Sequence, residues 1–86
     1  MNIFIPFKKN QNDDIALRFE SQKNIGMRVQ ILRAQRGWSK KKLAQEARVS
    51  EKYVYDIEVG KKNMSIWVLN KIAKTLGEDI SRILFD

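Results

Sequence analysis

Helix-start and helix-stop signals alternate along most of this chain, and this alternation limits the possible folds more than any other feature. Three serines each stand directly before a run of apolar residues at helical spacing, as N-cap residues do, and three glycines stand where such runs end. The serines are Ser39, Ser50 and Ser65, and the glycines are Gly37, Gly60 and Gly77. Asp79 precedes one last short run. The pattern predicts helices and no strands after residue 22.

We therefore predict an all-α fold: a compact five-helix domain over residues 23–86, preceded by a short N-terminal arm, residues 1–22. The predicted helices cover about residues 25–36, 39–47, 50–59, 65–76 and 79–84. The arm contains IFIPF, which Pro6 interrupts, then a polar linker, KKNQNDD, and a possible helical turn, IALRF. We expect it to be extended or partly disordered. Three arrangements stay open: disorder, packing on its own domain, and crossing to a second subunit.

The positive charge of the chain is concentrated in its middle. The net charge is +7, yet residues 1–22 and 63–86 each sum to zero. Residues 23–62 hold eleven Lys or Arg and four Asp or Glu, so the whole excess lies there. A basic block confined to one segment favours a polyanion partner, and a merely well-solvated surface is the alternative.

The composition argues against several other classes of protein. The chain has no cysteine and no histidine, which removes disulfides, most metal sites and the commonest catalytic arrangements. Its four glycines are scattered and form no phosphate-binding loop, and no apolar run is long enough to span a membrane. The start, MNIFIPFKK, does not follow the pattern of a secretory signal. We expect a cytoplasmic, non-enzymatic protein without a cofactor, metal or small-molecule substrate.

The second and third predicted helices are joined by only Arg48 and Val49. Two short helices on so tight a turn must cross steeply, as in a helix-turn-helix. At about 100° per residue, Val54 and Ile57 of the third helix face inward, whereas Lys52 and Asp56 point nearly opposite. The outward face at the start of the helix consists of Glu51, Lys52, Tyr53 and Tyr55. In this motif that end enters the major groove of DNA.

The sequence here resembles the phage-repressor type of helix-turn-helix regulator, the lambda repressor, Cro and Xre-like proteins. The resemblance covers about residues 24–85 and lies in IGMRVQILRAQRGWSKKKLA, VSEKYVYDIEVGKK and LNKIAKTLG. It implies that Glu51, Lys52 and Asp56 face base edges and that Tyr53 contacts bases or backbone. It also implies a partly buried ion pair between Arg33 and Glu58. Together with the outward face, it predicts backbone contacts from Lys40, Lys41, Tyr55, Lys61, Lys62 and Asn63.

Lysines 40–42 occupy the first turn of the second helix, where the helix dipole disfavours a cation by roughly 0.3–1 kcal/mol. Helix N-termini bind anions, phosphates included. The positions of the three lysines are explained if the start of this helix contacts a phosphate backbone. For Lys41 or Lys42 singly, solubility alone is an alternative explanation.

Three positions depart from the family pattern. Arg48 stands where glycine is common, in a turn that often takes the left-handed conformation. The carboxylates of Glu51 and Asp56 repel phosphate, but each can accept from the amino group of cytosine. For Glu51, base reading and a solvated position stay open; for Asp56 we favour an ion pair that holds Lys52 in place.

Two tryptophans have structural interpretations. Trp38 lies where the family has a core residue, whereas Trp67 is expected to be partly exposed and to form a dimerisation patch with Leu84 and Phe85.

These observations predict a transcriptional regulator, a repressor, that binds double-stranded DNA as a homodimer on a palindromic operator. The controller proteins of restriction–modification systems are one possible subtype, suggested by the segment GKKNMS. An antitoxin or protein-interaction subunit is a second hypothesis, and a basic surface that binds membranes or RNA without sequence preference is a third.

Overall fold

A computed structural model describes the chain over residues 11–61 and 64–85, with side chains described from residue 21 onward. Five helices follow one another: α1 (Gln11–Gln35), α2 (Lys40–Ala47), α3 (Glu51–Glu58), α4 (Ile66–Thr75) and α5 (Ser81–Leu84). No strand occurs in the described ranges. The all-α, five-helix prediction is confirmed.

The three predicted serine caps are present. The Oγ atoms of Ser39, Ser50 and Ser65 each accept a hydrogen bond from a backbone N–H three residues later, at 3.0, 3.0 and 3.1 Å. Each cap satisfies a backbone donor that has no partner within its own helix. The short helices α2, α3 and α4 therefore begin where the sequence indicates.

The first helix is longer than predicted. It begins at Gln11, not near residue 25, so residues 11–22 of the predicted arm are helical. Periodicity missed this part because its apolar stripe is weak, but no glycine or proline interrupts residues 11–24, and half of these residues are good helix formers. The first ten residues of the predicted arm lie outside the described residues.

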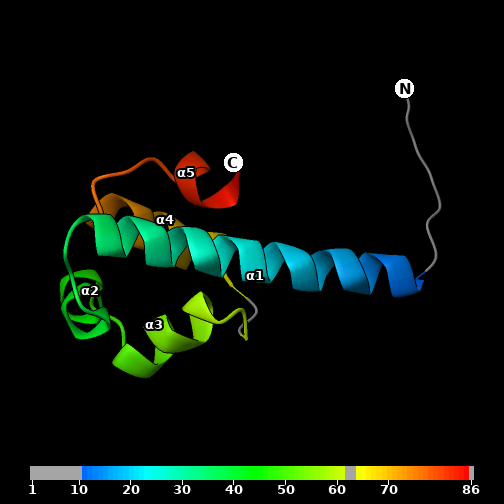
Figure 1. Cartoon of the computed structure of the whole chain (residues 1–86), viewed down its shortest axis with the longest axis horizontal. Coiled ribbons are helices and arrows are strands. Elements are labelled where there is room, and N and C mark those ends of the chain that lie inside the picture. The colour runs from blue at the N-terminus through cyan, green and yellow to red at the C-terminus, as the bar shows by residue number, and fades with distance from the viewer. Residues whose placement is uncertain (1–10, 62–63, 86) are drawn as a thin grey trace.

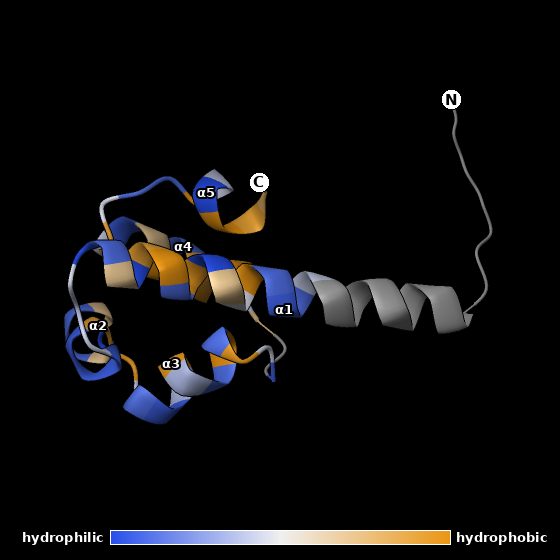
Figure 2. Cartoon of the chain, in the orientation of Figure 1, coloured by the Kyte–Doolittle hydropathy of each residue, from blue (hydrophilic) through white to orange (hydrophobic). Residues whose placement is uncertain are grey.

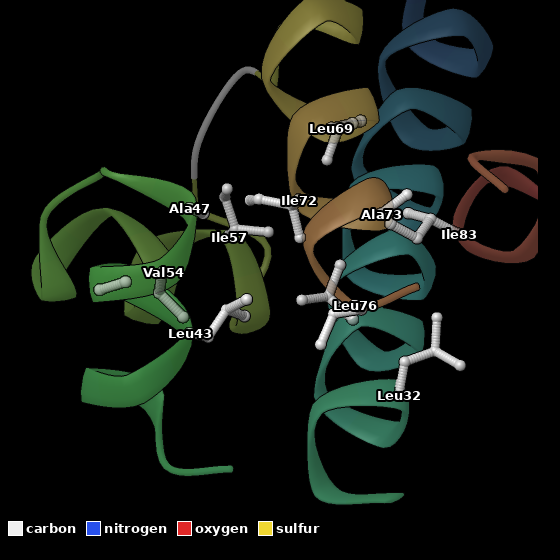
Figure 3. Packing of buried hydrophobic residues seen from close by; sticks show 12 residues of the cluster. Leu32, Leu43, Ala47, Val54, Ile57, Leu69, Ile72, Ala73, Leu76 and Ile83 are labelled. Carbon is white, nitrogen blue, oxygen red and sulfur yellow. The ribbon is translucent and has the colours of Figure 1, made fainter. Parts of the chain in front are cut away.

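Helices α2–α5 gather around the C-terminal part of α1, with α2 and α3 on one side of it and α5 on the other (Figure 1). Apolar residues from all five helices meet between them, while the outward faces of α2 and α3 are largely hydrophilic (Figure 2). Figure 3 shows Leu43, Ile57, Ile72 and Leu76 converging in this core. The same core thus carries both α2 and α3.

Arg28 of α1 and Arg36, the residue that follows its last position, attach the C-terminal helices to it. Arg36 Nη1 donates to the carbonyl oxygen of Leu76 at 3.0 Å, and Arg28 Nη1 donates to that of Ile83 at 2.9 Å. Both acceptors are carbonyls at the ends of helices, where intrahelical partners are lacking and cations are favoured. These bonds hold α4 and α5 against α1. They do not involve the outer faces of α2 and α3, which remain exposed.

Candidate nucleic-acid interface

The turn between α2 and α3 depends on one residue in an unusual conformation. Arg48 has φ 60° and ψ 45°, the left-handed region that the family resemblance implied for this position. Its N–H and that of Val49 donate to carbonyls of the last turn of α2, including that of Ala44 at 3.0 Å from Val49. Ala44 and Ala47 are buried against α3, and their small size lets the two helices approach closely. The result is the helix-turn-helix.

An ion pair fixes the C-terminal end of α3 to α1. Arg33 donates from Nε to Glu58 Oε2 at 2.6 Å and from Nη2 to Oε1 at 3.0 Å, while Nη1 donates to the carbonyl of Trp38 at 2.8 Å. The side chains are only 11% and 2% exposed. The hydrogen bonds to Glu58 raise the pKa of Arg33. This is the partly buried pair that the family resemblance implied, and its role is structural.

Two glycines allow α1 to lie directly against the end of α3. A Cβ atom on Gly26 would lie 2.2 Å from the carbonyl oxygen of Ile57 and 2.7 Å from that of Glu58. A Cβ atom on Gly60, whose φ is +77°, would lie 3.0 Å from Cα of Lys23. No other residue type fits Gly26 without moving one of the helices. The sequence analysis missed this contact, because a glycine inside a helix does not reveal which backbone lies beside it.

The outer face of α3 agrees with the prediction at three positions and not at two. Glu51 is exposed, the Lys52 side chain is 82% exposed and Tyr55 is 47% exposed. Tyr53 is half-buried and packs against the core, so it offers less surface than predicted.

Asp56 lies beside Lys52 as predicted, but it is only 6% exposed and so offers little surface for the predicted base contact. Helical angle alone placed it beside Lys52. After α3 the chain turns back at Gly60, and the N–H of Lys61 donates to the Asp56 carbonyl at 2.8 Å. In this position the Asp56 carboxylate pairs with Lys52, at 2.9 Å between Oδ2 and Nζ. The pairing that the i,i+4 spacing indicated is therefore present.

Cations lie at both ends of the helix pair. Lys40 is half-buried and Lys41 is exposed at the start of α2. Lys61 is exposed after α3, with Nζ 5.9 Å from the centre of the Tyr55 ring. The predicted contacts Lys62 and Asn63 lie outside the described residues. No described carboxylate pairs with Lys40, Lys41 or Lys61 in an ion pair, whereas Lys42 pairs with Glu46 at 3.2 Å.

The Trp38 side chain lies between two cations. The Arg36 guanidinium stands 4.7 Å, and Lys42 Nζ 5.7 Å, from the centre of its ring. These contacts are cation–π interactions, which hold the α1–α2 connection in shape. The sequence analysis placed Trp38 in the core; it is partly buried against it and also serves this second purpose.

The described part of the helix pair offers cations and exposed polar side chains. Within the described residues, no group of three acids suits a metal ion. No described helix is long and apolar enough to cross a bilayer.

A family model described as helix-turn-helix matches residues 29–83, well over half of the chain. The chain belongs to this helix-turn-helix family. The family and the similar solved structures indicate a DNA-binding regulator. No curated protein sequence matches the chain.

Solved structures similar to this helix-turn-helix protein include regulators. The clp gene regulator ClgR from Corynebacterium glutamicum is 28% identical, with a TM-score of 0.70 over 73% of this chain and 67% of its own. The restriction-modification controller protein C.AhdI from Aeromonas hydrophila is 26% identical, with a TM-score of 0.73 over 76% of this chain and 98% of its own. A transcriptional regulator of the same family from Vibrio cholerae is 30% identical, with a TM-score of 0.73, over 77% of this chain and 37% of its own.

Proposed function

We propose that this protein binds duplex DNA sequence-specifically as a homodimer on a two-fold related operator and represses transcription there. The observation that carries the proposal is Lys52: its side chain is 82% exposed on the second helix of the motif and is oriented by the nearly buried Asp56. A lysine held in this way suits the O6 and N7 acceptors of guanine in the major groove.

The lysines on either side of α3 also support docking of this helix into the major groove. Lys40 and Lys41 lie at the N-terminus of α2, where free backbone N–H groups and lysines both favour phosphate. Lys61 lies just beyond α3. Phosphate contacts on both sides of a helix fix its register on the duplex, and its side chains then select the sequence.

Glu51 is the second proposed base-reading residue. It is exposed at the first position of α3, where a carboxylate also interacts favourably with the helix dipole. If Glu51 accepts from the amino group of cytosine, Glu51→Ala relaxes selectivity at one base position while most of the affinity is kept. An unchanged site profile would assign Glu51 to helix stabilisation alone.

Selection of bound sequences from a random duplex library tests the proposal. We expect an enriched motif with two-fold symmetry and half-sites about one helical turn, roughly 34 Å, apart. A reporter gene behind that motif should be expressed less when the protein is present. Equal recovery of all duplexes, or an enriched motif without symmetry, would contradict sequence-specific binding by a symmetric dimer.

A role as a restriction–modification controller is the second candidate. Its support is the match to the Aeromonas controller, which extends over 98% of that chain. This role requires the selected motif to occur in the host genome beside genes for a nuclease and a methyltransferase. Mapping the motif onto the genome decides it.

A further inference from the structure

The turn between α2 and α3 contains an arginine in an unfavourable backbone conformation. Within the described part of the chain, Arg48 is the one residue other than glycine that has a positive φ. This left-handed conformation is strained for a residue with a Cβ atom, and glycine would relieve the strain. Strained residues occur most often at functional sites, where another interaction compensates for the strain. We therefore looked for the interaction that the Arg48 side chain makes.

The guanidinium of Arg48 has no partner among the described residues. No hydrogen bond or ion pair joins it to any of them. The acid closest before it in the sequence, Glu46, pairs with Lys42 at 3.2 Å. Every other arginine side chain that the structure describes bonds to a group of the same chain; these are Arg28, Arg33, Arg36 and Arg82. The charge of Arg48 is thus left for a partner outside the chain.

The fold directs Arg48 outward beside the start of α3. Its neighbours Ala47 and Val49 pack into the core, whereas Arg48 is exposed. Ser50, two residues after Arg48, caps α3. Since consecutive Cα atoms are about 3.8 Å apart, the Cα atoms of Arg48 and Glu51 lie at most roughly 11 Å from each other. The side chain therefore accompanies the N-terminal end of α3.

In the proposed function this end of α3 enters the major groove, which is about 12 Å wide and bordered by phosphates on both sides. A long cationic side chain beside the helix end can reach a bordering phosphate. The guanidinium is suited to this partner, because its planar donors match two phosphate oxygens at once. The lysines proposed for phosphate contact lie elsewhere, Lys40 and Lys41 at the start of α2 and Lys61 beyond the end of α3.

We propose that Arg48 is a further DNA-binding residue, whose guanidinium contacts a phosphate at the edge of the groove that receives α3. The contact explains why the turn contains arginine: glycine would fit the backbone better but would remove the charge. It also offsets the neighbouring carboxylate of Glu51, which repels phosphate. The inference rests on the proposed function and adds a residue to its interface. Because glycine is common at this position in the family, the contact is a property of this chain.

Replacing Arg48 should change stability and DNA binding in opposite directions. Arg48→Gly removes both strain and charge, so it should raise the Tm and lower the affinity for the selected duplex about tenfold. Arg48→Ala removes the charge and keeps the strain, so it should lower the affinity equally without raising the Tm. Arg82→Gln is the matched control, since it removes an exposed arginine from α5, and it should leave the affinity unchanged.

The salt dependence identifies the group that Arg48 contacts. Loss of one phosphate contact should reduce the magnitude of the salt slope by about 1 per protomer and weaken the selected duplex and a random duplex by the same factor. Arg48→Lys keeps the charge and should keep the wild-type slope. Fluorescence anisotropy with both duplexes at several salt concentrations provides these measurements.

Three results would overturn the proposal: an affinity that Arg48→Gly leaves unchanged, a loss confined to the selected duplex, or a slope that Arg48→Lys and Arg48→Gly reduce equally. The second of these would indicate a base contact instead of a phosphate contact. The wild-type protein distinguishes this inference from the proposed function. If it binds no duplex, the proposed function is refuted and the contact with it, whereas wild-type binding that is insensitive to Arg48→Gly refutes the contact alone.

Discussion

At the scale of single residues, Lys52 and Asp56 depend on each other. The Lys52 side chain is 82% exposed, so its ion pair contributes little to stability. The ion pair instead orients the Lys52 side chain. A long side chain that a nearly buried carboxylate already holds loses less rotamer freedom when it binds a partner. In the proposed complex with DNA, Asp56 would therefore contribute to recognition without needing to touch the duplex.

This division of roles predicts the outcome of a double-mutant cycle. Asp56→Asn should lower affinity for the selected operator about tenfold, since a charge-assisted hydrogen bond is lost, and Lys52→Gln should lower it by at least as much. Combining the two should add little. Affinities measured on the selected duplex check this. A full additional loss from Asp56→Asn in the Lys52→Gln background would show that Asp56 acts through something other than Lys52.

Arg48 is the other residue whose conformation decides its role. Its φ of 60° costs a residue with a side chain roughly 1–2 kcal/mol, which glycine does not lose. We expect Arg48→Gly to raise the free energy of unfolding by about 1 kcal/mol, measured by urea denaturation. Arg48→Ala keeps the strain and removes the side chain, so it serves as the control. Stabilisation by both variants alike would attribute the effect to the arginine side chain and not to backbone strain.

At the scale of helices, the position of α3 depends on its contact with α1. Because a Cβ at Gly26 would lie 2.2 Å from the Ile57 carbonyl oxygen, Gly26→Ala must push the helices apart. The same shift would strain the bidentate pair between Arg33 and Glu58, which ends at the same turn of α3. Helix α3 is thus held at its C-terminal end by backbone contact and by an ion pair.

We expect Gly26→Ala to lower the free energy of unfolding by about 3 kcal/mol, although alanine is the better helix former. Thermal and urea unfolding measure this. Gln30→Ala, an exposed position on the same helix, should change stability by less than about 0.5 kcal/mol. Equal stability of Gly26→Ala and the wild type would show that α1 and α3 are not in close backbone contact.

At the scale of the whole molecule, the side of α1 on which α2 and α3 lie differs in charge from the side on which α5 lies. The cations Lys40, Lys41, Lys52 and Lys61 belong to the helix pair and its flanks, whereas α5 lies on the opposite side of α1 (Figure 1). A duplex bound to the helix pair would therefore meet these four lysines, whereas residues 63–86 carry no net charge.

Binding should consequently weaken with salt. With about six to ten phosphates contacted, the logarithm of the association constant should fall with the logarithm of salt concentration with a slope near −5 to −9. Replacing Lys40 and Lys41 by glutamine should reduce the magnitude of the slope by about 2 per protomer, whereas Arg82→Gln on α5 should leave it unchanged. Fluorescence anisotropy at several salt concentrations provides the measurement. A slope that Arg82→Gln reduces equally would place the DNA elsewhere on the protein.

Local signals in the sequence determined the helix starts at Ser39, Ser50 and Ser65, because a cap depends on the few residues that form it. The left-handed turn at Arg48 was implied by the family resemblance, since arginine by itself does not favour that conformation. Only the tertiary structure decided the burial of Asp56, the contact at Gly26 and the beginning of α1 at Gln11. The first two depend on which distant segments come together, which helical angles cannot show. The third depends on helix propagation through residues that carry no strong apolar stripe.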